Sequence, residues 1–275
     1  MFHNSESIIN DDKLIVTILP SGVYITGQGP AIVFLHSSLS SAKQWSPLIQ
    51  KLKDRFTCIN IDILGYGNAD KVSDKGNYSF EAELQRIRLI LKASIQNSAY
   101  HLIGHSCGGA IALKLAVEAP EKLLSLSLYE PVAFHLLIKG SKERAEADSF
   151  AGRVANLSNE QAAQFFTDFW NCKGFYQKLP AKLQAAMAAD MEKVNLDFKG
   201  LISEKYQLVD LHVITCPAVV YSGEQSPSLS QHLAKNIAMA LPSGKLQIMD
   251  AGHMGPVNQA SLVLTKMAEF ILAEK

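Results

Sequence analysis

Short apolar runs alternate with amphipathic stretches along most of this 275-residue chain. Four runs of strand length lie at residues 31–35, 57–61, 100–103 and 123–129. Runs in which most positions are apolar are typical of parallel strands that are covered on both faces. Between them, apolar side chains recur at helical spacing, as at Trp45, Leu48, Ile49 and Leu52. The pattern predicts an α/β fold, with a mostly parallel sheet flanked by helices.

Four further strands complete an expected sheet of eight. Residues 14–19 and 23–26 are predicted to form an opening hairpin, with residues 20–22 (Pro-Ser-Gly) as its turn. Two more apolar runs, at 218–221 and 246–249, follow late in the chain. Together with the first four runs, they predict a mostly parallel eight-stranded sheet.

No strand is evident in residues 131–211, where helical patterns dominate. A capping box that opens at Ser158 predicts the start of one helix. Pro180 is expected to open another, whose apolar face carries Leu183, Met187, Met191 and Val194. An insertion at this point would lie over the carboxyl ends of the strands, where open α/β sheets bind ligands. We therefore expect a core of residues 1–130 and 212–275 and a helical cap of residues 131–211.

Composition excludes several classes of partner. Lys plus Arg and Asp plus Glu both number 26, so no net charge draws the chain to nucleic acid or to an anionic membrane. No apolar run approaches the length of a membrane span, and the polar first ten residues argue against a secretory signal. The cysteines show neither a C-x-x-C pair nor metal-ligand spacing; they are Cys58, Cys107, Cys172 and Cys216. We expect a cytoplasmic protein in a reducing compartment, and the sequence leaves its oligomeric state open.

The most informative segment runs from Gly104 to Gly108 and reads G-H-S-C-G. It follows the predicted strand 100–103 and precedes an apolar helical stretch that ends near Pro120. A G-x-S-x-G sequence between a strand and a helix is typical of a nucleophile elbow, a tight and strained turn that raises its serine above the sheet. The two glycines let the strand and the helix approach closely. Ser106 is therefore the candidate nucleophile.

A serine hydroxyl needs a base to take its proton, and His253 is the candidate. It lies in a glycine-containing loop after the last predicted strand, from which it can reach the elbow. Three other histidines lie on or beside predicted strands and are interpreted as packed structural residues; they are His36, His101 and His105. No neighbouring motif indicates a role for the remaining four histidines, which are His3, His135, His212 and His232.

These motifs resemble those of the α/β-hydrolase superfamily, and the resemblance covers nearly the whole chain. It rests on four segments in the family's order, which are residues 36–38, 62–67, 104–108 and 252–253. The resemblance implies a serine nucleophile first and a histidine base last. It also implies an oxyanion hole from the amides of Ser38 and Cys107, although Ser37 stands where the family usually has glycine. The segment from Asp62 to Gly67 is expected to shape a turn.

The acid of the expected triad is not at its usual place. The family commonly has an aspartate three residues after a glycine that ends the penultimate strand, and here that position holds Ser226. A serine cannot carry the charge that orients and stabilises an imidazolium. Some members take the acid from the end of the strand after the elbow helix, where this chain has Glu130, the favoured candidate. Glu224 is the second candidate, and a Ser–His dyad or a loss of catalysis is the third alternative.

A serine at the elbow argues against dehalogenases and epoxide hydrolases, which need an aspartate there. Serine with an oxyanion hole suits acyl transfer, so we expect a carboxylic-ester hydrolase that forms an acyl-enzyme on Ser106. Aromatic residues of the insertion predict a small, fairly apolar substrate, and the candidates for its pocket are Phe134, Phe166 and Trp170.

Other outcomes stay open at this point. The same fold supports thioesterases, amidases, carbon–carbon bond hydrolases, hydroxynitrile lyases and cofactor-free haloperoxidases. A weakly catalytic ligand receptor on this fold is the alternative from a different class, because the usual aspartate is missing. We expect a small-molecule partner, no nucleic acid and no membrane, and neither a metal nor an organic cofactor.

Overall fold

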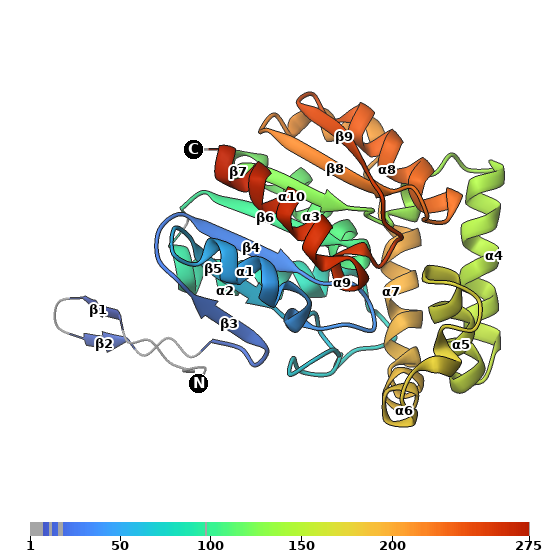
Figure 1. The fold of residues 1–275 in the computed structure, drawn as a ribbon. Coiled ribbons are helices and arrows are strands. Elements are labelled where there is room, and N and C mark those ends of the chain that lie inside the picture. The colour runs from blue at the N-terminus through green and yellow to red at the C-terminus, as the bar shows by residue number, and fades with distance from the viewer. Residues whose placement is uncertain (1–7, 11–12, 16–18, 97, 275) are drawn as a thin grey trace.

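The structure is a computed structural model, and it describes residues 8–10, 13–15, 19–96 and 98–274. At its centre lies a seven-stranded sheet in the order β3-β5-β4-β6-β7-β8-β9 (Figure 1). Its strands are β3 (Val23–Thr26), β4 (Ala31–Leu35), β5 (Thr57–Ile61), β6 (Tyr100–His105), β7 (Leu123–Tyr129), β8 (Ala218–Gly223) and β9 (Gly244–Met249). Within this sheet β3 runs antiparallel to β5, and every other neighbouring pair is parallel. The predicted α/β fold with a mostly parallel sheet is confirmed.

Helices cover both faces of the sheet. One face carries α1 (Ser46–Leu52) and α10 (Ala260–Ala273), preceded by the short α9 (Gly255–Asn258). The other face carries α2 (Phe80–Ile95), α3 (Ser106–Glu118) and α8 (Ser228–Ala240). Strand β4 shows why both faces need cover, since its alternate side chains enter opposite cores. Ile32 and Phe34 pack with α1 and α10, whereas Val33 and Leu35 pack on the other side.

The sheet has seven strands rather than the expected eight, because the opening hairpin is wrong. Strands β1 (Ile8–Asn10) and β2 (Lys13–Ile15) pair with each other and not with the sheet. Residues 16–18 of the expected first strand lie outside the described residues. Among the described residues, the pairing partner of β3 is β5. The carbonyl groups of Ser21 and Gly22 accept hydrogen bonds from Arg86 and from the amide of Asp62, which ties this segment to the region beside β5.

Between β7 and β8 the chain forms the helical insertion, which comprises α4 (Lys142–Asn156), α5 (Asn159–Trp170), α6 (Ala181–Ala189) and α7 (Met191–Ser203). These helices stand beyond the carboxyl ends of the parallel strands, at the right of Figure 1. The capping box predicted at Ser158 is present. The single helix predicted after Pro180 is wrong, since it breaks at Asp190 into α6 and α7. The break separates an α6 with no buried residue from an α7 that is largely buried.

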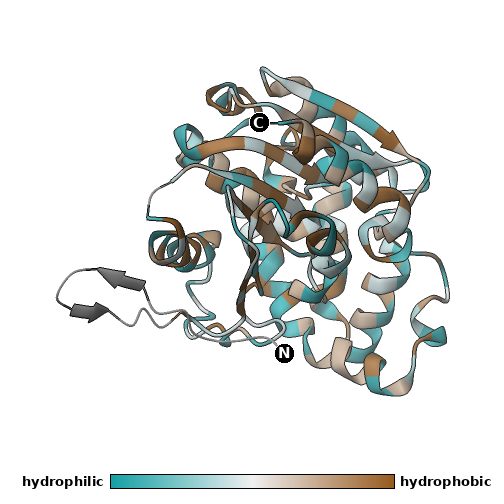
Figure 2. Ribbon diagram, turned by 60° about the vertical axis from the view of Figure 1, so that its left-hand side comes forward, coloured by the Kyte–Doolittle hydropathy of each residue, from teal (hydrophilic) through white to brown (hydrophobic). Residues whose placement is uncertain are grey.

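Short 3-10 helices occupy Ala42–Trp45, Pro120–Lys122, Phe134–Leu136, Tyr176–Lys178 and Leu208–Val213. In Figure 2 the middle strands are largely hydrophobic, whereas the surrounding helices show both hydrophobic and hydrophilic residues. This distribution is expected for helices that turn one face to a core and the other to water. None of the helices in the described ranges combines the length and the apolar character that crossing a membrane requires.

Four histidines predict a loss of stability in acid: His36, His101 and His105 are buried, and His135 is half-buried. Burial lowers the pKa of His36, His101 and His135 to about 4, and it holds the pKa of His105 well below the ordinary value of 6.5. The unfolded chain takes up these protons at a higher pH than the folded chain does. Stability is therefore fully present above about pH 6.5 and falls as the pH drops toward 4, by on the order of 2 kcal/mol at pH 5 for each of the three histidines whose pKa is about 4.

Urea denaturation at pH 7.5, 6 and 5 checks this prediction. The midpoint should fall steeply, and His101→Asn should make its pH dependence shallower by about one proton. His232→Gln serves as the control, because His232 is exposed. Equal midpoints at pH 7.5 and pH 5 would show that these histidines do not oppose protonation in the folded state.

Candidate active site

Ser106 occupies the turn between β6 and α3. Its φ is +54°, a left-handed conformation that is uncommon and costly for a residue with a side chain. A Cβ at Gly108 would lie 2.2 Å from the His36 carbonyl oxygen, and a Cβ at Gly104 would lie 2.7 Å from the Gly108 carbonyl oxygen. Only glycine therefore permits this approach of strand and helix. The predicted strand, tight turn and helix are all present.

The structure brings Ser106, His253 and Glu130 into one chain of hydrogen bonds. Nε2 of His253 lies 2.9 Å from Oγ of Ser106, and Nδ1 lies 2.6 Å from Oε2 of Glu130. A carboxylate only accepts, so Nδ1 carries the proton and Nε2 is free to accept from the serine hydroxyl. All three side chains are buried, with Ser106 at 7% exposure. Ser106 is thus buried, and Phe166 and Trp170 of the insertion line the space beside it.

Glu130 follows directly after β7 and also has a positive φ, of +42°. Its Oε1 accepts hydrogen bonds from the amide of Gly223 at 2.8 Å and from the hydroxyl of Ser222 at 3.2 Å. Burial alone would raise the pKa of this carboxyl, but the hydrogen bond and the attraction to His253 outweigh burial and lower its pKa. The side chain is therefore held as an acceptor-only carboxylate at neutral pH.

The two other positions considered for the acid lie differently. Glu224 is exposed, and its side chain makes no hydrogen bond to His253 within the described part of the chain. Ser226, at the usual aspartate position, is buried beside Glu130 and helps to lower the pKa of that carboxyl. Its Oγ makes no hydrogen bond of good geometry among the described residues. The carboxylate next to His253 thus comes from Glu130, the residue after β7. Ser226, at the usual acid position, lies beside that carboxylate.

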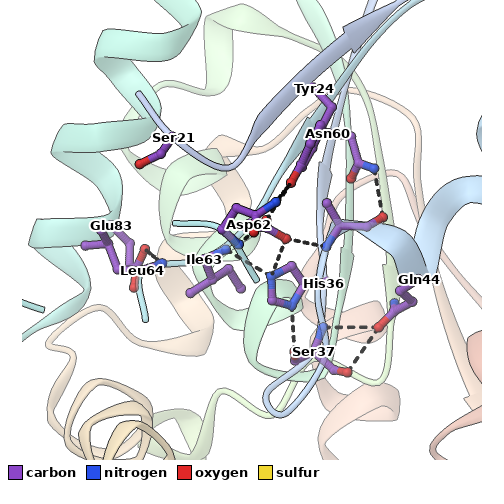
Figure 3. A network of polar contacts seen from close by, with 12 residues as sticks. Ser21, Tyr24, His36, Ser37, Gln44, Asn60, Asp62, Ile63, Leu64 and Glu83 are labelled. Carbon is purple, nitrogen blue, oxygen red and sulfur yellow. Dashed lines mark hydrogen bonds and ion pairs between the residues drawn. The ribbon is translucent and has the colours of Figure 1, made fainter. Parts of the chain in front are cut away.

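The loop after β4 is held by a polar network (Figure 3). Nδ1 of His36 donates to the Ser37 carbonyl at 2.7 Å, while Nε2 accepts from the amide of Ile63 at 2.9 Å. Both the amide and the hydroxyl of Ser37 donate to Oε1 of Gln44, at 3.3 Å and 3.1 Å. The serine in place of the usual glycine is thus anchored by its own side chain. The amide of Ser38 follows directly in this loop.

Asp62 forms the centre of the turn predicted at 62–67. Its carboxylate accepts from the amides of Ala42 and Asn68, at 2.6 Å and 2.9 Å, and from the hydroxyl of Tyr24 at 3.2 Å. A Cβ at Gly67 would lie 2.3 Å from this carboxylate, and φ at Gly67 is +56°. Asp62 therefore shapes the turn, and it lies beside His36, the first residue after β4, as Figure 3 shows.

Cys107 is the second residue of α3, so its amide is one of the first four in the helix, which have no acceptor within the helix. The positive end of the helix dipole adds to the attraction of such an amide for negative charge. Burial holds the pKa of the Cys107 thiol well above its ordinary value, so the thiol stays protonated and is a poor nucleophile.

A small pocket opens beside Ser106. It is lined by Ser38, Ser106, Val132, Phe134, Phe166, Trp170, Val194, Asp197, Phe198 and Leu201. The three aromatic residues predicted for the pocket, Phe134, Phe166 and Trp170, are among these lining residues. The free space is only about 10 Å³, on the order of one water molecule. Trp170 also lies over the imidazole of His253, with ring centroids 4.1 Å apart. Substrate entry therefore requires side chains or helices of the insertion to move.

A model of the alpha/beta hydrolase fold family matches residues 30–259. The chain belongs to this family. A Mycobacterium tuberculosis protein described as uncharacterized is 34% identical over 250 residues, which cover 83% of this chain and 71% of the relative. A fluoroacetate dehalogenase from Burkholderia is 27% identical over 133 residues. That match spans 47% of this chain but only 41% of the dehalogenase.

Solved structures agree on the fold of this hydrolase-family chain. The enol-lactonase from Burkholderia xenovorans superposes with a TM-score of 0.74 at 19% identity, covering 92% of this chain and 96% of that one. A thermophilic esterase from Thermogutta terrifontis gives a TM-score of 0.74 at 19% identity, covering 92% and 93%. Similarity at this level of identity shows the fold and leaves the substrate open.

Sequence reasoning missed two polar residues of α7 next to the pocket of this family member. Asp197 accepts hydrogen bonds from Ser38 and Tyr66, and Lys193 forms an ion pair with it. Both are buried, with 6% of Lys193 and 1% of Asp197 exposed. In the sequence they form only a lysine and an aspartate four residues apart, a spacing that is common on exposed helix faces. The described residues contain no cluster of three or more His, Cys, Asp or Glu side chains placed to hold a metal.

Proposed function

We propose that this protein is a serine hydrolase that cleaves small, fairly apolar carboxylic esters. The observation that supports this most is the chain of hydrogen bonds from Ser106 through His253 to Glu130, at 2.9 Å and 2.6 Å. Ser106 would attack the ester carbonyl while His253 takes its proton. His253 would then return that proton to the leaving alcohol, and water activated by the same imidazole would release the acid.

Glu130 would orient His253 and stabilise the imidazolium that forms in each step. The amides of Ser38 and Cys107 would donate to the oxyanion of the tetrahedral intermediate. Loss of one such donor costs on the order of 100- to 1000-fold in rate. The unusual place of the acid does not weaken the proposal, because the carboxylate is ordered by Gly223 and Ser222 and already contacts Nδ1.

The pocket lining supports a small apolar acyl or alcohol group. Seven of its residues are apolar; they are Val132, Phe134, Phe166, Trp170, Val194, Phe198 and Leu201. Two of the structural neighbours are described as an enol-lactonase and an esterase. Both belong to the same reaction class as the one proposed here. The cytoplasmic location expected from the cysteines stays a prediction.

A panel of p-nitrophenyl esters tests this function. We expect turnover of acetate and butyrate esters and a fall of at least about tenfold in kcat/KM for the octanoate and longer esters, because the closed pocket has little free space. A fluorophosphonate probe should label the folded protein rapidly. A protein that stays unlabelled and hydrolyses none of these esters would favour the ligand receptor over the hydrolase.

A further inference from the structure

Beneath the insertion lies a group of buried charged and hydroxyl side chains, here called the α7 cluster. It consists of Lys193 and Asp197 of α7, Glu83 of α2, Tyr66, Tyr78 and Ser38. Lys193 and Asp197 come from the insertion. Glu83 lies on α2, Ser38 lies in the loop after β4, and Tyr66 and Tyr78 lie between β5 and α2. The three charged residues are almost fully buried, with 1% of Glu83, 6% of Lys193 and 1% of Asp197 exposed.

Every oxygen of Asp197 has a partner. Oδ2 accepts from the hydroxyl of Ser38 and from that of Tyr66, both at 2.6 Å, and Oδ1 pairs with Nζ of Lys193. Nζ also donates to Oη of Tyr78 at 3.1 Å and lies 3.5 Å from Oε1 of Glu83. The carboxylate is thus satisfied by the protein itself. It is better suited to hold a neighbouring group than to bind a substrate.

The ammonium of Lys193 compensates the buried negative charge of Asp197. Burial would lower the pKa of Lys193, but the carboxylates of Asp197 and Glu83 outweigh burial and raise it, so Lys193 stays charged. Its stem packs against Gly65, where a Cβ would lie 3.1 Å from Cγ of Lys193 and where φ is +82°. The turn at 62–67 therefore makes room for Lys193 as well as directing Tyr66 toward Asp197.

A buried ion pair of this kind contributes little net stability, because desolvation offsets most of the attraction. The position of the ion pair beside the pocket matters more than its contribution to stability. Asp197 and Ser38 line the same pocket as Ser106, and Ser38 is the residue whose amide would bind the oxyanion in the proposed function. Its hydroxyl is the link between the loop after β4 and the insertion.

We propose that Asp197, neutralised by Lys193, is a positioning residue that holds the Ser38 amide in its oxyanion-binding orientation. The inference rests on the proposed function and adds a residue of the insertion to it. Because Asp197 lies on α7, the oxyanion hole is complete only when α7 is docked on the sheet layer. Lys193 prevents the carboxylate from repelling the negative charge that develops on the substrate.

Steady-state kinetics with p-nitrophenyl acetate and the rate of fluorophosphonate labelling test the proposal. Ser38→Ala and Asp197→Ala should each lower kcat by about 10- to 100-fold and leave KM within about threefold, since displacement of a donor acts on the transition state. The double variant should lose no more than the larger single loss, because both changes break one link. Labelling rates should fall in parallel with kcat.

Two further variants keep the test decisive. Asp197→Asn replaces Asp197→Ala if the latter does not fold, and it should show a smaller loss in kcat. Asp148→Asn is the matched control, because Asp148 is also paired with a basic residue four positions away, Arg144, but lies exposed on α4. This control should keep wild-type kinetics.

The outcomes separate this inference from the proposed function. If kcat is unchanged in both single variants, or if the two losses multiply in the double variant, Asp197 does not act through Ser38. A rise in KM with kcat unchanged would assign these residues to ground-state binding and overturn the positioning role. If the wild-type protein is neither labelled nor active, the proposed function fails and the inference fails with it.

Discussion

Replacing Ser106 by alanine should lower ester turnover by at least about 10⁴-fold and abolish labelling by a fluorophosphonate. The reason is that, in the part of the chain that the structure describes, the imidazole of His253 contacts the hydroxyl of Ser106 and no second nucleophile. Among the described residues, Oγ of Ser106 is the only hydrogen-bond partner of Nε2 of His253, and the neighbouring thiol of Cys107 is kept protonated by burial. The measurement is kcat/KM for p-nitrophenyl acetate, together with mass spectrometry of the treated protein.

Ser228→Ala provides the matched control for this variant. Like Ser106, Ser228 is the first residue of a helix, but it is exposed and belongs to α8. We expect it to keep wild-type turnover and labelling. Full ester hydrolysis by Ser106→Ala would disprove the acyl-enzyme mechanism, even if the fold and the pocket are as described.

Glu130→Gln should lower kcat by about 10³- to 10⁴-fold while leaving the fold intact. Oε1 of Glu130 accepts from the Gly223 amide and the Ser222 hydroxyl, so the amide oxygen of a glutamine should take this place. The glutamine NH2 group would then face Nδ1 of His253, which would have to accept. The imidazole proton would move to Nε2, and that nitrogen could no longer take the proton of Ser106.

The buried serine at the usual acid position offers a rescue for this variant. Ser226 lies beside the Glu130 carboxylate, so Ser226→Asp combined with Glu130→Gln should recover part of the lost kcat. Ser226→Asp alone should lower activity, because two adjacent buried carboxylates repel each other and one of them takes up a proton. Glu224→Gln, which alters an exposed carboxylate, should change kcat little.

Thermal unfolding, measured together with kcat across pH, distinguishes this outcome from a loss of the fold. A variant that has lost only the acid keeps its thermal unfolding transition and loses turnover at every pH from 6 to 9. If Glu130→Gln turns over at the wild-type rate, the acid is not needed and Ser106 and His253 act as a dyad.

The strands could be predicted well because the sequence shows them locally. The bounds expected for β4, β5 and β7 agree with the structure, since each is a mostly apolar run of strand length. The pairing of the first strand could not be predicted in this way. Ser21 and Gly22 are hydrogen-bonded to Arg86 and Asp62, which are distant in sequence, and no local pattern indicates these contacts.

The candidate site shows the same division. The elbow at Ser106 is a local strand–turn–helix motif, so its geometry could be expected from the sequence alone. Glu130 could be suggested only by its place after a strand, and its hydrogen bond to His253 needed the fold. Lys193 and Asp197 gave no usable signal, because nothing in their spacing distinguishes a buried pair from an exposed one.

The helical insertion leaves the sheet after β7 and returns at β8, and these two strands are direct neighbours, with Leu126 opposite Ala218. The two ends of the whole segment are therefore fixed on adjacent strands of one sheet. Lengthening or shortening a connection between fixed ends changes the closure entropy only slowly. An exchange of this segment for one of different size would leave the sheet in place, and the new segment would have to supply its own partner for the Ser38 hydroxyl in place of Asp197. Evolution could thus change the substrates that the protein accepts by exchanging the helical insertion while the sheet stays unchanged.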